Sequence, residues 1–255
     1  MQWSQLPRHL FLSRFTWQES ATIRAMDERL LSENISKLLK RVRLTAEKCQ
    51  RKPGETRVLA VSKTRPSGDI RQAYHCGLTE FGESYLQEAQ TKMAELEDLP
   101  LTWHFIGPIQ SNKTRAIAAH FDWVHSIDRS KVARRLSEHR PEHLPKLQVC
   151  IQVNISDETT KSGVRLADLA QLARAILALP RLELRGLMAI PAATGEPQLQ
   201  REAFARLRSA LVELRPLAPG VDTLSMGMSN DFEAAIAEGS TILRIGTGIF
   251  GARNR

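Results

Sequence analysis

The residue whose chemistry stands out first is Lys63, which directly follows the short apolar run 58–62 (VLAVS). A lysine that is partly desolvated at the end of a strand has a lowered pKa and a reactive neutral amine. Such an amine is suited to form a Schiff base with an aldehyde. Taken alone, the same position also fits a surface lysine that begins a loop.

A glycine-rich segment near the other end of the chain, 244–251 (RIGTGIFG), has the composition of an anion site. Gly246 and Gly248 allow the backbone to approach a ligand closely, and Thr247 adds a hydroxyl. Successive N–H groups in such a turn form an anion nest. Arg244 ends the run before these glycines, where it either points at a ligand or forms a salt bridge at the rim of the fold.

A second polar segment, 226–231 (MGMSND), leads from an expected strand into an expected helix. Ser229 would then lie at a helix N-terminus, where phosphate binds well. An amine together with a phosphate site indicates an aldehyde cofactor that carries a phosphate. Pyridoxal 5′-phosphate is the candidate.

The elements that must position these residues alternate regularly from Met26 onward. We expect strands at 57–62, 79–82, 102–106, 123–127, 148–154, 184–188, 223–226 and 241–245. Helical patterns lie between them at 66–76, 85–97, 112–120, 129–140, 166–177, 199–214 and 231–237, with Asp128 and Asn230 as expected caps. Strands joined by helices in this way predict a single (β/α)8 TIM barrel in the α/β class, whose site lies at the carboxyl ends of the strands. A doubly wound open sheet is the alternative, but its G-x-G-x-x-G after the first strand is absent.

The N-terminal part of the chain lies outside this alternation. We expect an additional helix at 27–51 that closes the amino end of the barrel, and we expect residues 1–25 to form a poorly ordered extension. The predicted cofactor-binding barrel domain is therefore 26–255. His104, in the strand at 102–106, is either a site histidine or a buried core histidine.

The composition limits the classes of partner. The net charge of +8 raises the possibility of nucleic-acid binding, but the basic residues are scattered and no nucleic-acid motif accompanies them. We therefore expect no specific nucleic acid, and no apolar run is long enough to span a membrane. The three cysteines have wide spacings and form no C-x-x-C pair, which favours a reducing compartment and a cytoplasmic protein. No metal-binding motif is present, so no metal is expected.

Several longer motifs occur together along the chain. They are 60–64 (AVSKT), 81–88 (FGESYLQE), 103–113 (WHFIGPIQSNK), 153–156 (VNIS), 161–163 (KSG), 186–188 (GLM), 224–229 (LSMGMS), 244–247 (RIGT) and 250–251 (FG). With these motifs the chain resembles the pyridoxal-phosphate homeostasis protein family, a racemase-like family, over roughly residues 26–253. The resemblance implies a barrel like the N-terminal domain of bacterial alanine racemase.

The resemblance also implies roles for individual residues. Lys63 would be the Schiff-base lysine, and Ser229, Gly246 and Thr247 would hold the phosphate of the cofactor. Arg244 would lie near the pyridine nitrogen, where an arginine makes the ring a weaker electron sink than a carboxylate would. Ser84 departs from the family, which usually has asparagine at this position, so the contact expected there is open.

Two functions remain from this reading. The first is a protein that holds pyridoxal phosphate reversibly through Lys63, takes part in vitamin B6 homeostasis and passes the cofactor to apo-enzymes. The second is a pyridoxal-phosphate-dependent amino-acid racemase or a related small-substrate enzyme. Racemisation needs a proton-transferring group on each face of the cofactor, and family racemases take the second from an additional β domain. The sequence continues only to Arg255 after the barrel, so we favour the first function and assign no catalytic residue. The resemblance implies a monomer.

Overall fold

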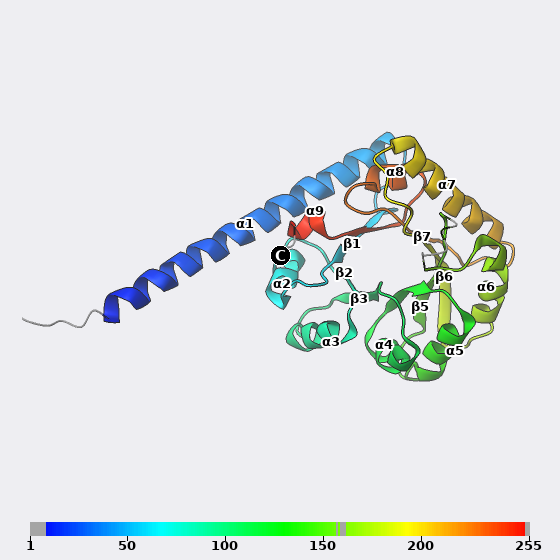
Figure 1. Cartoon of the computed structure of the whole chain (residues 1–255), viewed down its shortest axis with the longest axis horizontal. Helices are drawn as coiled ribbons and strands as arrows, with labels where there is room; N and C mark the ends of the chain where they lie inside the picture. The colour runs from blue at the N-terminus through cyan, green and yellow to red at the C-terminus, as the bar shows by residue number, and fades with distance from the viewer. Residues whose placement is uncertain (1–8, 157, 159–161, 253–255) are drawn as a thin grey trace, which may run out of the picture.

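The computed structural model describes residues 9–156, 158 and 162–252 and forms a closed barrel of eight parallel strands (Figure 1). Each strand pairs with the next in chain order, and β8 closes the ring by pairing with β1 through Val58↔Leu243 and Ala60↔Ile245. The strands are β1 (Arg57–Val61), β2 (Glu80–Glu83), β3 (Thr102–Phe105), β4 (Trp123–Ile127), β5 (Leu147–Gln152), β6 (Leu182–Met188), β7 (Thr223–Ser225) and β8 (Ile242–Ile245). The closed ring confirms the predicted barrel and excludes the open doubly wound sheet.

Helices alternate with the strands and surround the barrel (Figure 1). They are α2 (Ser67–His75), α3 (Leu86–Glu95), η1 (Ser111–Lys113) with α4 (Thr114–His120), α5 (Ser130–His139), η2 (Leu166–Asp168) with α6 (Leu169–Leu177), α7 (Pro197–Leu214), α8 (Phe232–Ala237) and α9 (Thr247–Phe250). The short helix α9 was not predicted, because Gly248 within it and its flanking residues Gly246 and Gly251 are poor helix formers.

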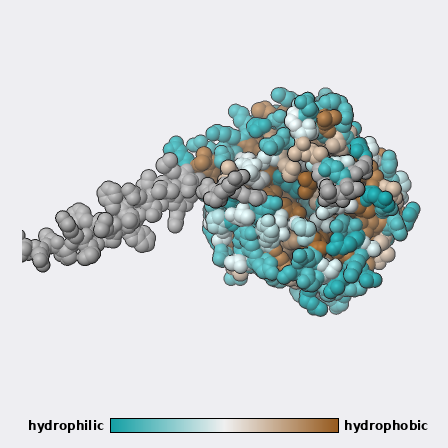
Figure 2. All heavy atoms as spheres, in the orientation of Figure 1, coloured by the Kyte–Doolittle hydropathy of each residue, from teal (hydrophilic) through white to brown (hydrophobic). Residues whose placement is uncertain are grey.

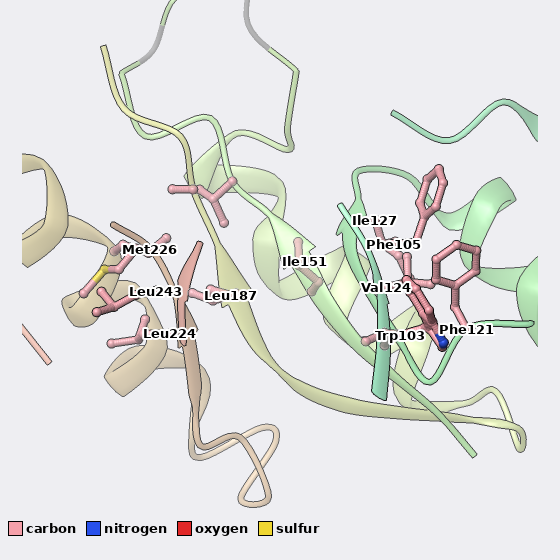
Figure 3. Close-up of a cluster of buried hydrophobic side chains, with 14 of the residues drawn as sticks. Trp103, Phe105, Phe121, Val124, Ile127, Ile151, Leu187, Leu224, Met226 and Leu243 are labelled. Carbon is pink, nitrogen blue, oxygen red and sulfur yellow. The ribbon is translucent and has the colours of Figure 1, made fainter. Parts of the chain in front are cut away.

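Two layers of apolar side chains form the core. The larger layer lies between the strands and the helices, and Figure 3 shows Trp103, Phe105 and Phe121 gathered in one part of it. The smaller layer packs Leu59 and Ile242 with Trp123 and comes from strands across the barrel. The face of the barrel shown in Figure 2 is mostly hydrophilic, with smaller hydrophobic areas.

Charged side chains lie where the strands begin. The guanidinium carbons of Arg57 and Arg185 lie 5.5 and 5.2 Å from the centre of the Trp123 ring, at cation–π distance. Arg57 also pairs with Glu80 at 2.8 Å, and Arg185 pairs with Asp222. Charged and aromatic side chains from β1, β2, β4 and β6, together with Asp222 directly before β7, therefore pack together near the amino end of the barrel.

The N-terminal helix α1 (His9–Lys48) is longer than expected and lies elsewhere. It begins at His9 rather than at residue 27, so the expected domain boundary at 25/26 falls within a continuous helix. It packs against α2, α8 and α9 on the side of the barrel instead of closing the amino end, with Arg41 paired to Glu233 at 3.0 Å (Figure 1). Residues 1–8 of the expected extension lie outside the described residues. None of the helices among the described residues combines the length and the apolar character needed to span a bilayer.

Two expected helix caps are wrong. Helix α5 begins at Ser130, and the Asp128 carboxylate pairs with the Arg129 side chain at 2.6 Å instead of capping a helix N–H. Helix α8 begins at Phe232 with Asp231, not Asn230, at the N-cap position. The Asp231 carboxylate accepts a hydrogen bond from the backbone N–H of Met228. The carboxylates of Asp128 and Asp231 therefore both accept hydrogen bonds from residues of their own loops, Arg129 and Met228.

Candidate functional site

A cavity of about 330 Å³ opens at the carboxyl ends of the strands. Its size lies at the lower end of the range of about 300–1,000 Å³ that is usual for small-molecule sites. It collects residues that lie far apart in the sequence. They are Val61, Lys63, Arg65, Ser84, Ile106, Ile190, Met228, Ser229, Asn230, Arg244, Gly246, Thr247, Phe250 and Gly251. All of the expected cofactor-binding residues, namely Lys63, Ser229, Arg244, Gly246 and Thr247, therefore line one cavity.

Lys63 enters the cavity from a turn that follows β1. The N–H of Ser62 still bonds to the carbonyl of Gly82 on β2 at 3.1 Å, so the strand pairing continues to the residue before Lys63. The N–H of Arg65 then bonds to the carbonyl of Ser62 at 3.0 Å and closes the turn. Lys63 is half-buried there, as expected for a strand-end lysine with partial access to solvent.

Arg244 lies at the inner wall of the cavity and is buried. Its guanidinium donates to the carbonyl and the hydroxyl of Ser225, at 2.5 and 2.8 Å, and to the carbonyl of Ala189 at 2.9 Å. Burial lowers its pKa to about 10, so it stays charged at neutral pH. No carboxylate bonds to it within the described residues, so the expectation of a salt-bridged rim is not met.

A chain of buried polar side chains continues from Arg244 through the inside of the barrel. The Ser225 hydroxyl contacts His125 Nδ1 at 2.7 Å, and His125 Nε2 contacts His104 Nδ1 at 2.9 Å. Both histidines are fully buried, and His104 stacks on Trp123 with ring centres 5.5 Å apart. His104 is therefore a core histidine that does not line the cavity, and its contact with His125 places it at the end of the polar chain that begins at Arg244.

The two buried histidines of this hydrogen-bonded row, His104 and His125, are uncharged at neutral pH. Burial, together with the nearby charges of Arg244 and Arg57, lowers the pKa of His125 to about 3. Burial also places the pKa of His104 well below its ordinary value of 6.5, with a contribution from His125. The neutral rings can donate and accept along the chain without adding a second charge beside Arg244.

The glycine-rich segment and Ser229 meet at one end of the cavity. The Ser229 hydroxyl accepts a hydrogen bond from the N–H of Gly248 at 3.1 Å and contacts the Thr247 hydroxyl at 3.0 Å. We expected Ser229 at the N-terminus of the helix that follows it in the sequence. This is wrong, because that helix, α8, begins only at Phe232. It lies instead at the start of α9, whose N-cap residue is Gly246.

Gly227 permits the close packing behind this end of the cavity. Its φ of +94° lies in the left-handed region that favours glycine. A Cβ at this position would lie 2.6 Å from the Cβ of Ala235 and 2.9 Å from Leu243 Cδ2. The glycine of the 226–231 segment is thus required by backbone geometry and by space.

A buried charged cluster next to Lys63 was not predicted. Lys92 on α3 donates to the Ser62 carbonyl and to Glu83 Oε1, both at 2.8 Å, and to Glu88 Oε1 at 2.5 Å. Glu83 also accepts from the Ser62 hydroxyl at 2.7 Å, and burial raises its pKa despite these bonds. The only sequence signal was the i, i+4 spacing of Glu88 and Lys92, which is common on exposed helix surfaces.

Comparison with known proteins agrees with this arrangement. The family model described as alanine racemase, N-terminal domain, matches residues 34–254. The chain belongs to this family.

Within the alanine racemase N-terminal domain family, curated relatives cover nearly the whole barrel. The chain is 59% identical over 224 residues to the pyridoxal phosphate homeostasis protein of Pseudomonas aeruginosa, a match that covers 88% of this chain and 96% of the relative. It is 50% identical over 227 residues to the protein of the same name from Escherichia coli K12, with 88% and 97% covered.

A solved structure of a family member provides a direct comparison. PipY of Synechococcus elongatus, solved with pyridoxal phosphate bound, is 37% identical and superimposes with a TM-score of 0.75. The match covers 87% of this chain and all of PipY. The resemblance stated from the sequence motifs is therefore confirmed.

Proposed function

We propose that this protein holds pyridoxal 5′-phosphate reversibly in the cavity, as a Schiff base with Lys63, and takes part in vitamin B6 homeostasis. One observation carries the proposal. The amine of Lys63 and the hydroxyl and backbone donors of Ser229, Gly246 and Thr247 line the same cavity, whose size suits a small molecule. The names of the curated relatives and the cofactor in PipY support the same function.

The residues around the cavity fit the two ends of this cofactor. Lys63 provides the amine for its aldehyde, and Ser229, Gly246 and Thr247 provide hydroxyl and backbone donors for its phosphate. When bound, the cofactor supplies an electrophilic carbonyl carbon, and its pyridine ring acts as an electron sink. Arg244, which stays a cation despite its burial and donates to Ser225 and Ala189, would disfavour a proton on the ring nitrogen.

A ring that is a weaker electron sink stabilises a carbanion at the α-carbon less, which agrees with storage of the cofactor. The names of the relatives likewise favour the homeostasis function over a racemase. Transfer of the cofactor to apo-enzymes and a monomeric state belong to the proposal as well. A cytoplasmic location also belongs to it, since Cys49, Cys76 and Cys150 are all free thiols.

The proposal is tested by titrating the purified protein with pyridoxal phosphate. We expect a visible imine band, a single adduct at Lys63 after borohydride reduction, and loss of the band when a competing apo-enzyme is added. Incubation with L-amino acids should give D-enantiomer no faster than free cofactor does. Sustained racemisation well above that rate would contradict the proposal, and so would protein that takes up no cofactor.

The phosphate end is tested by Ser229→Asp. A carboxylate about 4 Å from a phosphate is repelled even at the edge of the protein, and we expect affinity for pyridoxal phosphate to fall at least about tenfold. Pyridoxal, which has no phosphate, serves as the matched ligand, and its affinity should change little. An equal loss for both ligands would place the phosphate elsewhere.

A further inference from the structure

The turn that carries Lys63 contains an unfavourable backbone conformation. Thr64, directly after Lys63, has a φ of +65°. For a β-branched residue this left-handed conformation is an outlier, because its side chain crowds the backbone. Such strain persists only where the surroundings hold it, and it often accompanies a functional constraint.

The surroundings that hold this turn are the charged cluster on β2 and α3. The N–H of Thr64 donates to Glu88 Oε1 at 2.5 Å. The same Glu88 oxygen accepts from Lys92, whose ammonium also bonds to the Ser62 carbonyl. The cluster therefore grips the peptide groups on both sides of Lys63.

The other members of the cluster fix Lys92 itself. Its side chain is only 6% exposed, and Glu83, which is fully buried, accepts from it and from the Ser62 hydroxyl. An ammonium with three oxygen acceptors is fully satisfied, so Lys92 is a rigid centre for the cluster. A surface ion pair between Glu88 and Lys92 alone would not have this rigidity.

We infer that Glu88, Lys92 and Glu83 act as a clamp that sets the Ser62–Arg65 turn and thereby directs the Lys63 amine into the cavity. These are positioning residues, and the inference rests on the proposed function of Lys63. The clamp holds the amine in the one direction from which it can reach the carbonyl carbon. Because misplacement of a reacting group by about 1 Å can cost roughly 100-fold in rate, the turn geometry sets the rate of imine formation.

The test is the rate of imine formation in Glu88→Ala, followed by stopped-flow absorbance after mixing with pyridoxal phosphate. We expect a rate about tenfold below wild type, since the Thr64 N–H loses its acceptor and the turn relaxes. Glu88→Gln keeps an acceptor oxygen and should retain most of the rate. Thr64→Gly, combined with Glu88→Ala, should restore much of it, because glycine adopts the left-handed conformation without strain.

Glu95→Ala is the matched control. Glu95 lies on the same helix as Glu88 and accepts from the Ser67 hydroxyl on α2, so it links α3 to α2 without contacting the Lys63 turn. We expect its rate to equal that of wild type. A purely structural role of Glu88 would lower the unfolding midpoint but leave the rate unchanged, and this result would overturn the inference.

Thr64→Pro provides a second test, at a residue outside the cluster. Its result does not depend on whether Glu88→Ala folds. Proline fixes φ near −65° and removes the N–H, so the rate should fall further than in Glu88→Ala. A wild-type rate in Thr64→Pro would also overturn the inference. Lys63→Ala in the same assay separates the two proposals: an imine that still forms defeats the proposed function, whereas its loss with an unaffected Glu88→Ala defeats only the clamp.

Discussion

Lys63→Ala should give a protein that shows no imine absorbance with pyridoxal phosphate and no adduct after borohydride reduction. Lys63 is the lysine of the described cavity, and the hydroxyl and amide donors there cannot replace an amine as nucleophile. The remaining phosphate contacts would still bind the cofactor noncovalently and weakly. We expect apparent affinity to fall by about 100-fold or more, since a covalent bond is lost. Absorbance titration and peptide mapping measure both effects.

Two further variants make this result specific. Lys63→Arg keeps the positive charge but carries a guanidinium that stays protonated, so it too should form no imine. Lys131→Ala removes an exposed lysine on α5 and should behave as wild type. A band of wild-type intensity in Lys63→Ala, or a reduced adduct on another lysine, would show that the assignment is wrong.

Acid should destabilise this barrel through the histidines that anchor Arg244. Burial keeps His125 neutral in the folded protein, with a pKa of about 3, whereas in the unfolded chain it binds a proton below about pH 6.5. The unfolded state then binds more protons, so stability falls as the pH decreases from 6.5 towards 3. At pH 5 His125 alone reduces the free energy of unfolding by about 2 kcal/mol relative to neutral pH. His104 adds to this loss in the same direction.

Urea unfolding of wild type and His125→Asn at pH 7.5 and pH 5.0 measures the effect. Glu83 and Asp231, whose pKa values are raised by burial, act with the opposite sign, but they are common to both proteins. We expect wild type to lose about 2 kcal/mol more than the variant between the two pH values. His143→Asn, at an exposed position, should lose as much as wild type. Equal losses in wild type and His125→Asn would contradict the role of His125.

The sequence predicted the barrel and the cavity residues for the same reason. Each of Lys63, Ser229 and Arg244 lies at or just after the end of an apolar strand run, and the carboxyl ends of parallel strands meet at one face of a barrel. Their convergence therefore follows from strand order and did not need coordinates. Helix boundaries were less certain, because the side chains of Asp128 and Asp231 bond within their loops.

What only the tertiary structure decided is how these residues are held. Lys92 looks like an ordinary helix lysine in the sequence, and it is buried only because α3 packs over the ends of β1 and β2, where Ser62 and Glu83 lie. The hydrogen-bonded chain from Arg244 through Ser225 to His125 joins β8 and β7 to β4, and His125 lies 100 residues before Ser225 in the sequence. Periodicity reports which face of a strand is buried, but not which polar side chains meet across the inside of a closed barrel. That meeting depends on the register and closure of the strands.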